Sequence, residues 1–117
     1  ELVEYYRTEL SNLTQAELVQ EVPWCDTAWH LMPLLINYEK LEINRVALFS
    51  ELNAQGIYPQ VHYQPVHLQP YWRSRNLNCS LPGAEEYYHR VFSLPLFVDM
   101  TEQDVVRVRT SLASALK

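Results

Sequence analysis

The residues best suited to chemistry lie in one proline-rich segment near the middle of the chain. They are imidazole and phenol side chains, namely His62, Tyr63, His67 and Tyr71, followed by the indole of Trp72. Pro65 and Pro70 lack amide donors and favour extended geometry in the residue before each, so residues 64–78 are predicted to form a loop. A rigid loop that carries such groups at the end of a strand is a typical ligand site. The alternative is that the aromatic rings only close one end of a hydrophobic core.

A metal site is a second interpretation of the same histidines. His62 and His67 flank four residues, and Cys79 and His89 could complete a tetrahedral set. The spacing matches no familiar zinc pattern, and Pro65 fixes the loop without directing both rings to one point. The sequence therefore predicts that no metal is bound.

Four helices are expected from apolar spacing and cap signals. Leu2, Tyr6, Leu10 and Leu13 fall on one face, which predicts a helix over 1–13. A second helix is expected at 39–55, with Gly56 as its C-terminal cap and an inward face made of Val46, Leu48, Phe49 and Leu52. A third is expected at 82–90, with Pro82 near its first position. The fourth is expected to begin at Thr101 with a Thr101–Asp104 capping box, and its inward residues are Val105, Val108, Leu112 and Leu116. One further helical turn is expected at 70–73.

Three strands are expected between these helices. The run 27–38 is almost continuously apolar, which predicts a buried strand holding His30 as a hydrogen-bonded core histidine, and Pro33 indicates an edge position or a bulge. In residues 57–63, Ile57, Pro59, Val61 and Tyr63 alternate with Tyr58, Gln60 and His62. This alternation predicts a strand in which His62 points away from the face that carries Ile57. A short strand is expected at 92–98, whereas 14–22 suits a helical turn or an edge strand equally well. The fold class is then α+β, with a small, mainly antiparallel sheet and helices packed on one face.

Composition narrows the class of protein. The chain has 117 residues, enough for a single domain with a real core, and 48% of them are hydrophobic. A formal net charge of −5 with no basic run argues against a nucleic-acid partner. Two cysteines, Cys25 and Cys79, are too few for a disulfide framework and are expected to be buried thiols. The longest apolar run is too short to cross a bilayer, so we expect no membrane partner and a cytoplasmic location.

Several motifs resemble, in order, the C-terminal part of the DegT/DnrJ/EryC1/StrS family. They are Ala28-Trp29-His30-Leu31, Gly56-Ile57, His62-Tyr63-x-Pro65-x-His67, Pro70-Tyr71, Pro82-x-Ala84-Glu85, Ser93-Leu94-Pro95-Leu96 and Thr101-x-x-Asp104. Members of this family are aminotransferases that use pyridoxal phosphate (PLP) and act on nucleotide-linked keto-sugars. The sequences Gln60-Val61-His62-Tyr63 and His67-Leu68-Gln69-Pro70-Tyr71 look most like the branch that aminates UDP-linked 4-keto-sugars, as in pseudaminic acid biosynthesis. Met32 and Trp72 stand where many relatives have tyrosine.

The resemblance implies that 1–117 is the small C-terminal domain of such an enzyme, with 1–13 leading in from a missing N-terminal large domain. It implies that His62 and His67 donate hydrogen bonds to a sugar-nucleotide diphosphate and that Tyr63 and Tyr71 contact the base or sugar. The catalytic residues would lie outside this chain, because Lys40 and Lys117 are its only lysines and neither sits in the family's cofactor-lysine context. We therefore expect a fragment that binds no PLP and is inactive alone.

Two other functions fit the same residues. The chain could be a non-enzymatic sugar-nucleotide-binding module, or part of a PLP-dependent sugar dehydratase, which differs by losing the catalytic lysine. If it is a fragment, apolar side chains that faced other parts of the enzyme would be uncovered, and this predicts a homo-oligomer. The candidates for exposure are Leu2, Tyr6, Trp24, Tyr71 and Trp72.

Overall fold

The computed structural model describes residues 1–75 and 79–117; the last three residues of the predicted loop 64–78 lie outside this part of the chain. The elements in chain order are α1 (Leu2–Leu10), β1 (Ala16–Leu18), β2 (Met32–Ile36), α2 (Arg45–Ala54), the 3-10 turn η1 (Val66–Leu68), α3 (Pro70–Arg73), α4 (Pro82–Arg90), β3 (Val91–Leu94) and α5 (Glu102–Ala115). The strands form one antiparallel sheet in the order β1-β2-β3. The predicted α+β class and antiparallel sheet are confirmed.

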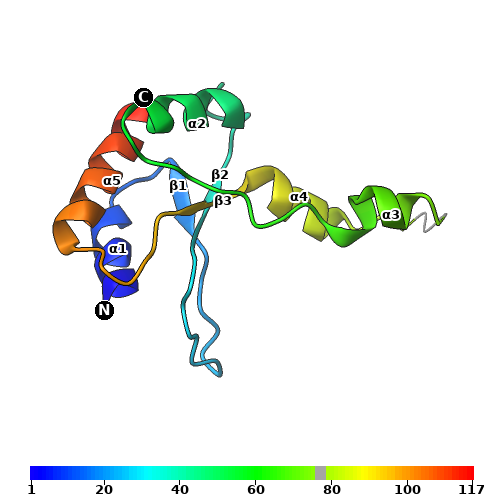
Figure 1. Ribbon diagram of the computed structural model, residues 1–117, viewed down its shortest axis with the longest axis horizontal. Coiled ribbons are helices and arrows are strands. Elements are labelled where there is room, and N and C mark those ends of the chain that lie inside the picture. Colours follow the sequence, from blue (N-terminus) through cyan, green and yellow to red (C-terminus); the bar gives the residue numbers. More distant parts are fainter. Residues whose placement is uncertain (76–78) are drawn as a thin grey trace.

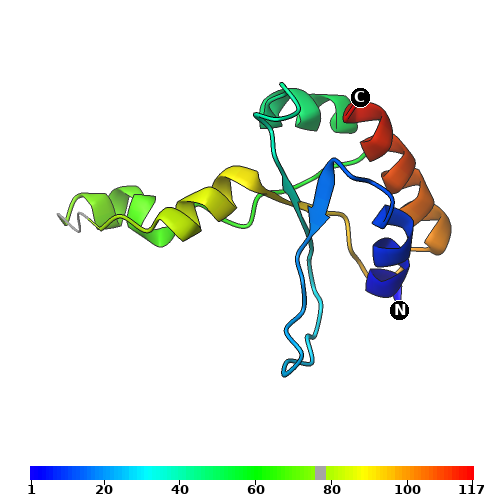
Figure 2. The same cartoon turned by 180° about the vertical axis from the view of Figure 1, so that it is seen from behind.

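The hydrophobic core lies between the sheet and a cluster made of α1, α2 and α5. Both α1 and α2 pack on α5, and Figures 1 and 2 show these three helices gathered on one side of the strands. Val3, Tyr6 and Leu10 of α1 are buried. The four apolar positions predicted for the last helix, Val105, Val108, Leu112 and Leu116, are buried as well. Periodic apolar spacing therefore predicted the buried face of α5 correctly.

Side-chain caps fix where two of these helices begin. Thr101 accepts a hydrogen bond from the Asp104 amide, and the Asp104 carboxylate accepts one from the Thr101 amide at 2.8 Å, so the predicted capping box of α5 is confirmed. Asn44 caps α2 by accepting a hydrogen bond from the Ala47 amide at 2.8 Å. The helix predicted over 39–55 is thus shorter at its start, and Val46 in its first turn is exposed rather than inward.

Pro33 lies in the middle strand, so its predicted edge position is wrong. Its partner on β3 is Ser93, whose amide and carbonyl both bond to Gln60 on the other side, at 2.7 and 3.1 Å. Pro33 and Ser93 therefore form a pair without mutual hydrogen bonds, and the nitrogen of Pro33 points towards β1. There β1 has already ended at Leu18, which pairs with Leu34. A proline at position 33 therefore removes no hydrogen bond between the strands.

The strand predicted over 57–63 is reduced to one bridge. Residues 57–63 run extended beside β3, but only Gln60 pairs with it, opposite Ser93. The strand predicted at 92–98 is also shorter and ends at Leu94, directly before Pro95. The ambiguous stretch 14–22 contains the edge strand β1.

Two arms project from the body. One is the segment 19–31 between β1 and β2, and the other contains η1, α3 and α4 (Figures 1 and 2). The radius of gyration is 15.6 Å, whereas a compact domain of this length would have about 13 Å. Within residues 1–75 and 79–117, no helix combines the length and apolar character needed to cross a bilayer.

The arms explain three wrong predictions. His30 is exposed on the first arm rather than buried in a strand, because β2 begins only at Met32. Cys25 and Cys79 are exposed thiols, not buried ones.

Of the apolar residues expected at the surface, Trp24, Tyr71 and Trp72 are exposed and Leu2 is half-buried. Tyr6 of α1 is instead fully buried, and its hydroxyl donates a hydrogen bond to the Pro95 carbonyl at 2.8 Å.

The two glycines of the chain should respond oppositely to alanine. Gly56 ends α2 with φ +74°, and a Cβ there would lie 2.9 Å from Arg107 Nη2. Gly83 lies in the first turn of α4 and a Cβ there meets nothing within 4 Å. We expect Gly56→Ala to lower the free energy of unfolding by about 1–2 kcal/mol and Gly83→Ala to raise it by about 0.5 kcal/mol. Urea denaturation of both variants checks this, and equal effects would contradict the cap geometry.

Candidate functional site

The segment that follows α2 positions the candidate residues. After the Gly56 cap, the Ile57 amide bonds to the Leu52 carbonyl at 2.9 Å, which turns the chain towards β3. The Gln60–Ser93 bridge then holds it against the outer edge of β3. From there the segment runs past His62 and Tyr63 into the arm that carries η1 and α3.

His62 is half-buried beside β3. Its Nδ1 lies 3.0 Å from Ser93 Oγ and its Nε2 lies 3.2 Å from Gln60 Oε1. The ring also makes an edge-to-face contact with Tyr63, with centroids 4.8 Å apart. Both ring nitrogens of His62 therefore have partners within the chain.

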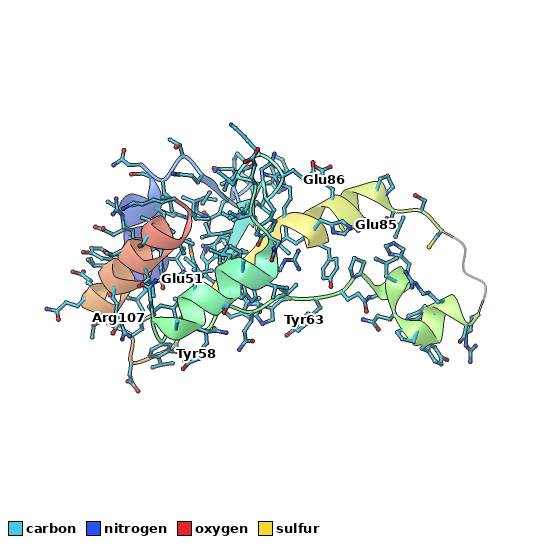
Figure 3. The ribbon with its side chains drawn as sticks, turned by 90° about the horizontal axis from the view of Figure 1, so that it is seen from above. Glu51, Tyr58, Tyr63, Glu85, Glu86 and Arg107 are labelled. Carbon is cyan, nitrogen blue, oxygen red and sulfur yellow. The ribbon has the colours of Figure 1, made fainter. Side chains whose placement is uncertain are left out.

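A pocket of about 400 Å³ opens next to His62. Its lining comes from four parts of the chain: Leu31 just before β2, the segment after α2, the end of β3 with the residues that follow it, and the first half of α5. Ile57 is buried in the core and His62 is half-buried, and both border this pocket. Arg107 lines the pocket too and donates a hydrogen bond to the Gln55 carbonyl at 2.8 Å. Figure 3 shows Tyr58 and Arg107 together at the side of the body away from the α3–α4 arm.

His67 is buried between η1 and α4. Its Nε2 lies 3.0 Å from Glu85 Oε1, and the same oxygen accepts a hydrogen bond from the Leu81 amide at 3.2 Å. The hydrogen bond from His67 is the main cause that lowers the pKa of Glu85, and the Leu81 amide adds to it. Figure 3 shows Glu85 on the side of α4 turned towards the segment that carries Tyr63, and Glu86 on the opposite side. The His67–Glu85 pair ties the loop to α4.

The tyrosines of the segment are open to solvent. Tyr63 is 74% exposed and Tyr71 is 57% exposed. Tyr71 packs edge-to-face on Trp72, and the guanidinium of Arg75 lies 4.7 Å from the centre of the Tyr71 ring. The structure thus separates the four predicted site residues into two anchored imidazoles and two exposed phenols.

The residues proposed for a metal are not brought together. Across the described residues, no three histidine, cysteine, aspartate or glutamate side chains group closely enough to hold a metal ion. His67 uses Nε2 for Glu85 and His62 uses both ring nitrogens elsewhere.

PLP needs a lysine amine and a cradle of donors for its phosphate. Lys40 lies in the exposed turn before α2, where it lines a separate hollow with residues of β1, and Lys117 is exposed at the end of the chain. Gly56 is occupied as a helix cap, and Gly83 lies within α4. That this chain alone binds no PLP stays a prediction.

Two residues of this region were missed by reasoning from the sequence alone. Ser93 and Glu85 are the partners of His62 and His67, respectively. Both fall within motifs that had been noted, but they lie 31 and 18 residues from their histidines. The two residues of each pair lie on different segments, so no periodicity within one helix or strand relates them.

The His67–Glu85 contact makes stability depend on pH. Glu85 has a pKa below its ordinary value of 4.5 in the folded chain, so its carboxylate stabilises the fold above about pH 4.5 and this contribution is lost as the pH falls through the lowered pKa. We expect Glu85→Gln to lower the urea midpoint at pH 7 and to lower it much less at pH 3. Glu86→Gln is the matched control, because Glu86 is 73% exposed and forms an ion pair with Arg90 at 3.9 Å. A Glu85→Gln deficit that stays constant over this range would contradict the assignment.

Comparison with known proteins gives one consistent result. The model of the DegT/DnrJ/EryC1/StrS aminotransferase family matches residues 1–113. The uncharacterized protein MJ1066 of Methanocaldococcus jannaschii is 38% identical over 110 residues, which are 92% of this chain and 28% of that protein.

Solved structures of aminotransferases share this fold. DesV of S. venezuelae, solved in complex with a ketimine intermediate, is 30% identical with a TM-score of 0.83 and is matched over 99% of this chain and 30% of its own. PseC of Helicobacter pylori, an aminotransferase involved in pseudaminic acid biosynthesis, is 20% identical with a TM-score of 0.86, over 97% of this chain and 30% of its own. The chain spans less than a third of the length of these relatives. With its seven ordered motifs set on this small α+β fold, the chain belongs to the DegT/DnrJ/EryC1/StrS aminotransferase family.

Proposed function

We propose that this chain is the small C-terminal domain, residues 1–117, of a PLP-dependent aminotransferase that acts on nucleotide-linked keto-sugars. The observation that carries the proposal is the family match over residues 1–113, together with the span of only 28–30% of each relative. A large domain would supply the cofactor lysine and the phosphate cradle. Bound there, PLP would act as the electron sink for transamination.

The contribution of this chain would be to bind and orient the substrate. Tyr63 and Tyr71 are exposed and can donate a hydroxyl hydrogen bond or present a ring face to a base or sugar. Arg73 and Arg75 in and after α3 are exposed cations that suit a diphosphate. His62 and His67 hold the ends of the segment that carries Tyr63, and His62 also borders the pocket.

For the substrate we propose a UDP-linked 4-keto-sugar. The basis is the resemblance of the segment Gln60-Val61-His62-Tyr63 to pseudaminic-acid-type enzymes. The structural likeness to PseC supports the fold. Two exposed thiols, Cys25 and Cys79, suit a reducing compartment, and we place the enzyme in the cytoplasm on that ground.

The uncovered apolar side chains suit a larger assembly. Trp24 at the end of the first arm is 85% exposed, and Val98, between β3 and α5, is 96% exposed. Large apolar side chains left open in this way mark contact surfaces. We propose that they face the large domain and a second subunit of a homo-oligomer.

The test joins this chain to its large domain in the full-length protein. We expect that protein to take up PLP, to turn yellow and to aminate a UDP-linked 4-keto-sugar, while the 117-residue chain alone stays colourless. A well-folded full-length protein that binds PLP but removes water from the sugar instead would identify a dehydratase. One that takes up no PLP would identify a binding module.

The exposed phenols give a finer prediction. In the full-length enzyme, Tyr63→Phe or Tyr71→Phe should raise KM for the nucleotide sugar about 2- to 10-fold, because each removes one hydrogen bond that is worth about 0.5–1.5 kcal/mol. The control is Tyr5→Phe on α1, which lies outside this segment. Steady-state kinetics check this, and an equal KM in all three variants would count against the assigned contacts.

A further inference from the structure

His62 has two partners of very different kinds. Ser93, at Nδ1, belongs to the fully buried strand β3 and is 4% exposed. Gln60, at Nε2, is an exposed residue. One nitrogen is therefore held by the interior of the domain and the other by a partner that can be replaced.

These partners determine where the proton of the neutral ring lies. The Oε1 atom of Gln60 can only accept, so Nε2 of His62 carries the proton and donates it. Nδ1 is then a bare acceptor, and the hydroxyl of Ser93 donates to it. The two contacts fix the orientation of the ring, and the acceptor oxygen of Gln60 favours the tautomer that carries its proton on Nε2.

We propose that Ser93 is a positioning residue for substrate binding, and that Gln60 occupies the place of an acceptor oxygen of the substrate. Ser93 holds the His62 ring so that its Nε2–H lies at the pocket, and the arriving acceptor displaces the side chain of Gln60. This inference rests on the proposed function for the identity of the substrate. It does not depend on that function for the tautomer of His62.

The surroundings suit an anionic acceptor such as a diphosphate oxygen. Arg107 lines the same pocket and carries a positive charge. Its guanidinium has several N–H donors, and the hydrogen bond to the Gln55 carbonyl uses one of them. The one carboxylate among the pocket residues, that of Asp104, is already engaged by Thr101 in the capping box of α5. A substrate phosphate would thus meet a donor on His62 and a cation on Arg107.

The first test observes the ring directly. Nitrogen-15 NMR of the histidine side chains in the 117-residue chain should show His62 as a single Nε2–H tautomer with Nδ1 accepting a hydrogen bond. Ser93→Ala should remove the hydrogen bond that Nδ1 accepts and shift the Nδ1 resonance, while Gln60→Ala should leave that hydrogen bond in place. Ser111→Ala is the matched control, since Ser111 is also a buried serine but lies on α5. Identical His62 shifts in wild type and Ser93→Ala would overturn the positioning role.

The second test uses the full-length enzyme and a UDP-linked 4-keto-sugar. Ser93→Ala should raise KM about 2- to 10-fold, whereas Gln60→Ala should leave KM unchanged or lower it because no partner has to be displaced. Ser93→Thr, which keeps the hydroxyl, should restore KM in part. A rise in KM for Gln60→Ala would overturn the displacement, and an unchanged KM for Ser93→Ala would overturn the positioning. If the wild-type enzyme aminates no nucleotide sugar, the proposed function fails while the NMR result still decides the state of His62.

Discussion

Strand β3 is the constraint on which the rest of the structure depends. All four of its residues are buried, and it uses both of its edges: β2 pairs on one side and Gln60 on the other. A strand buried in this way must satisfy its backbone groups on both sides. The segment after α2 therefore has one place to lie, against the outer edge of β3. That placement puts His62 beside the hydroxyl of Ser93.

Local signals in the sequence were enough to predict the helices. The box of Thr101 and Asp104, the cap at Gly56 and Pro82 at the start of α4 all act within a few residues, and each was found where it was expected. Strand predictions were weaker because a strand depends on its neighbours. Pro33 is tolerated in the middle strand only because β1 ends before reaching it and Ser93 bonds to Gln60 instead.

The candidate site was predictable in its residue types but not in its connections. Imidazoles and phenols between prolines indicated a ligand loop, and the structure places Tyr63 and Tyr71 at the surface. The partners of the histidines come from β3 and α4, elements that only the tertiary fold brings to the loop. His30 shows the opposite error: an apolar run suggested burial, but the chain leaves the sheet before reaching that residue and forms an arm.

The loop is held at three points, and this has a consequence for recognition. The Gln60–Ser93 bridge and the His62–Ser93 contact fix it to β3, and the His67–Glu85 pair fixes it to α4. Tyr63 lies between the second and third of these points, so its backbone is held although most of its side chain is exposed. A ligand that binds there would have to order side chains but little backbone, which reduces the entropic cost of binding. A chain with a formal net charge of −5 can bind an anionic ligand under these conditions, because a few donors held in place outweigh the average charge.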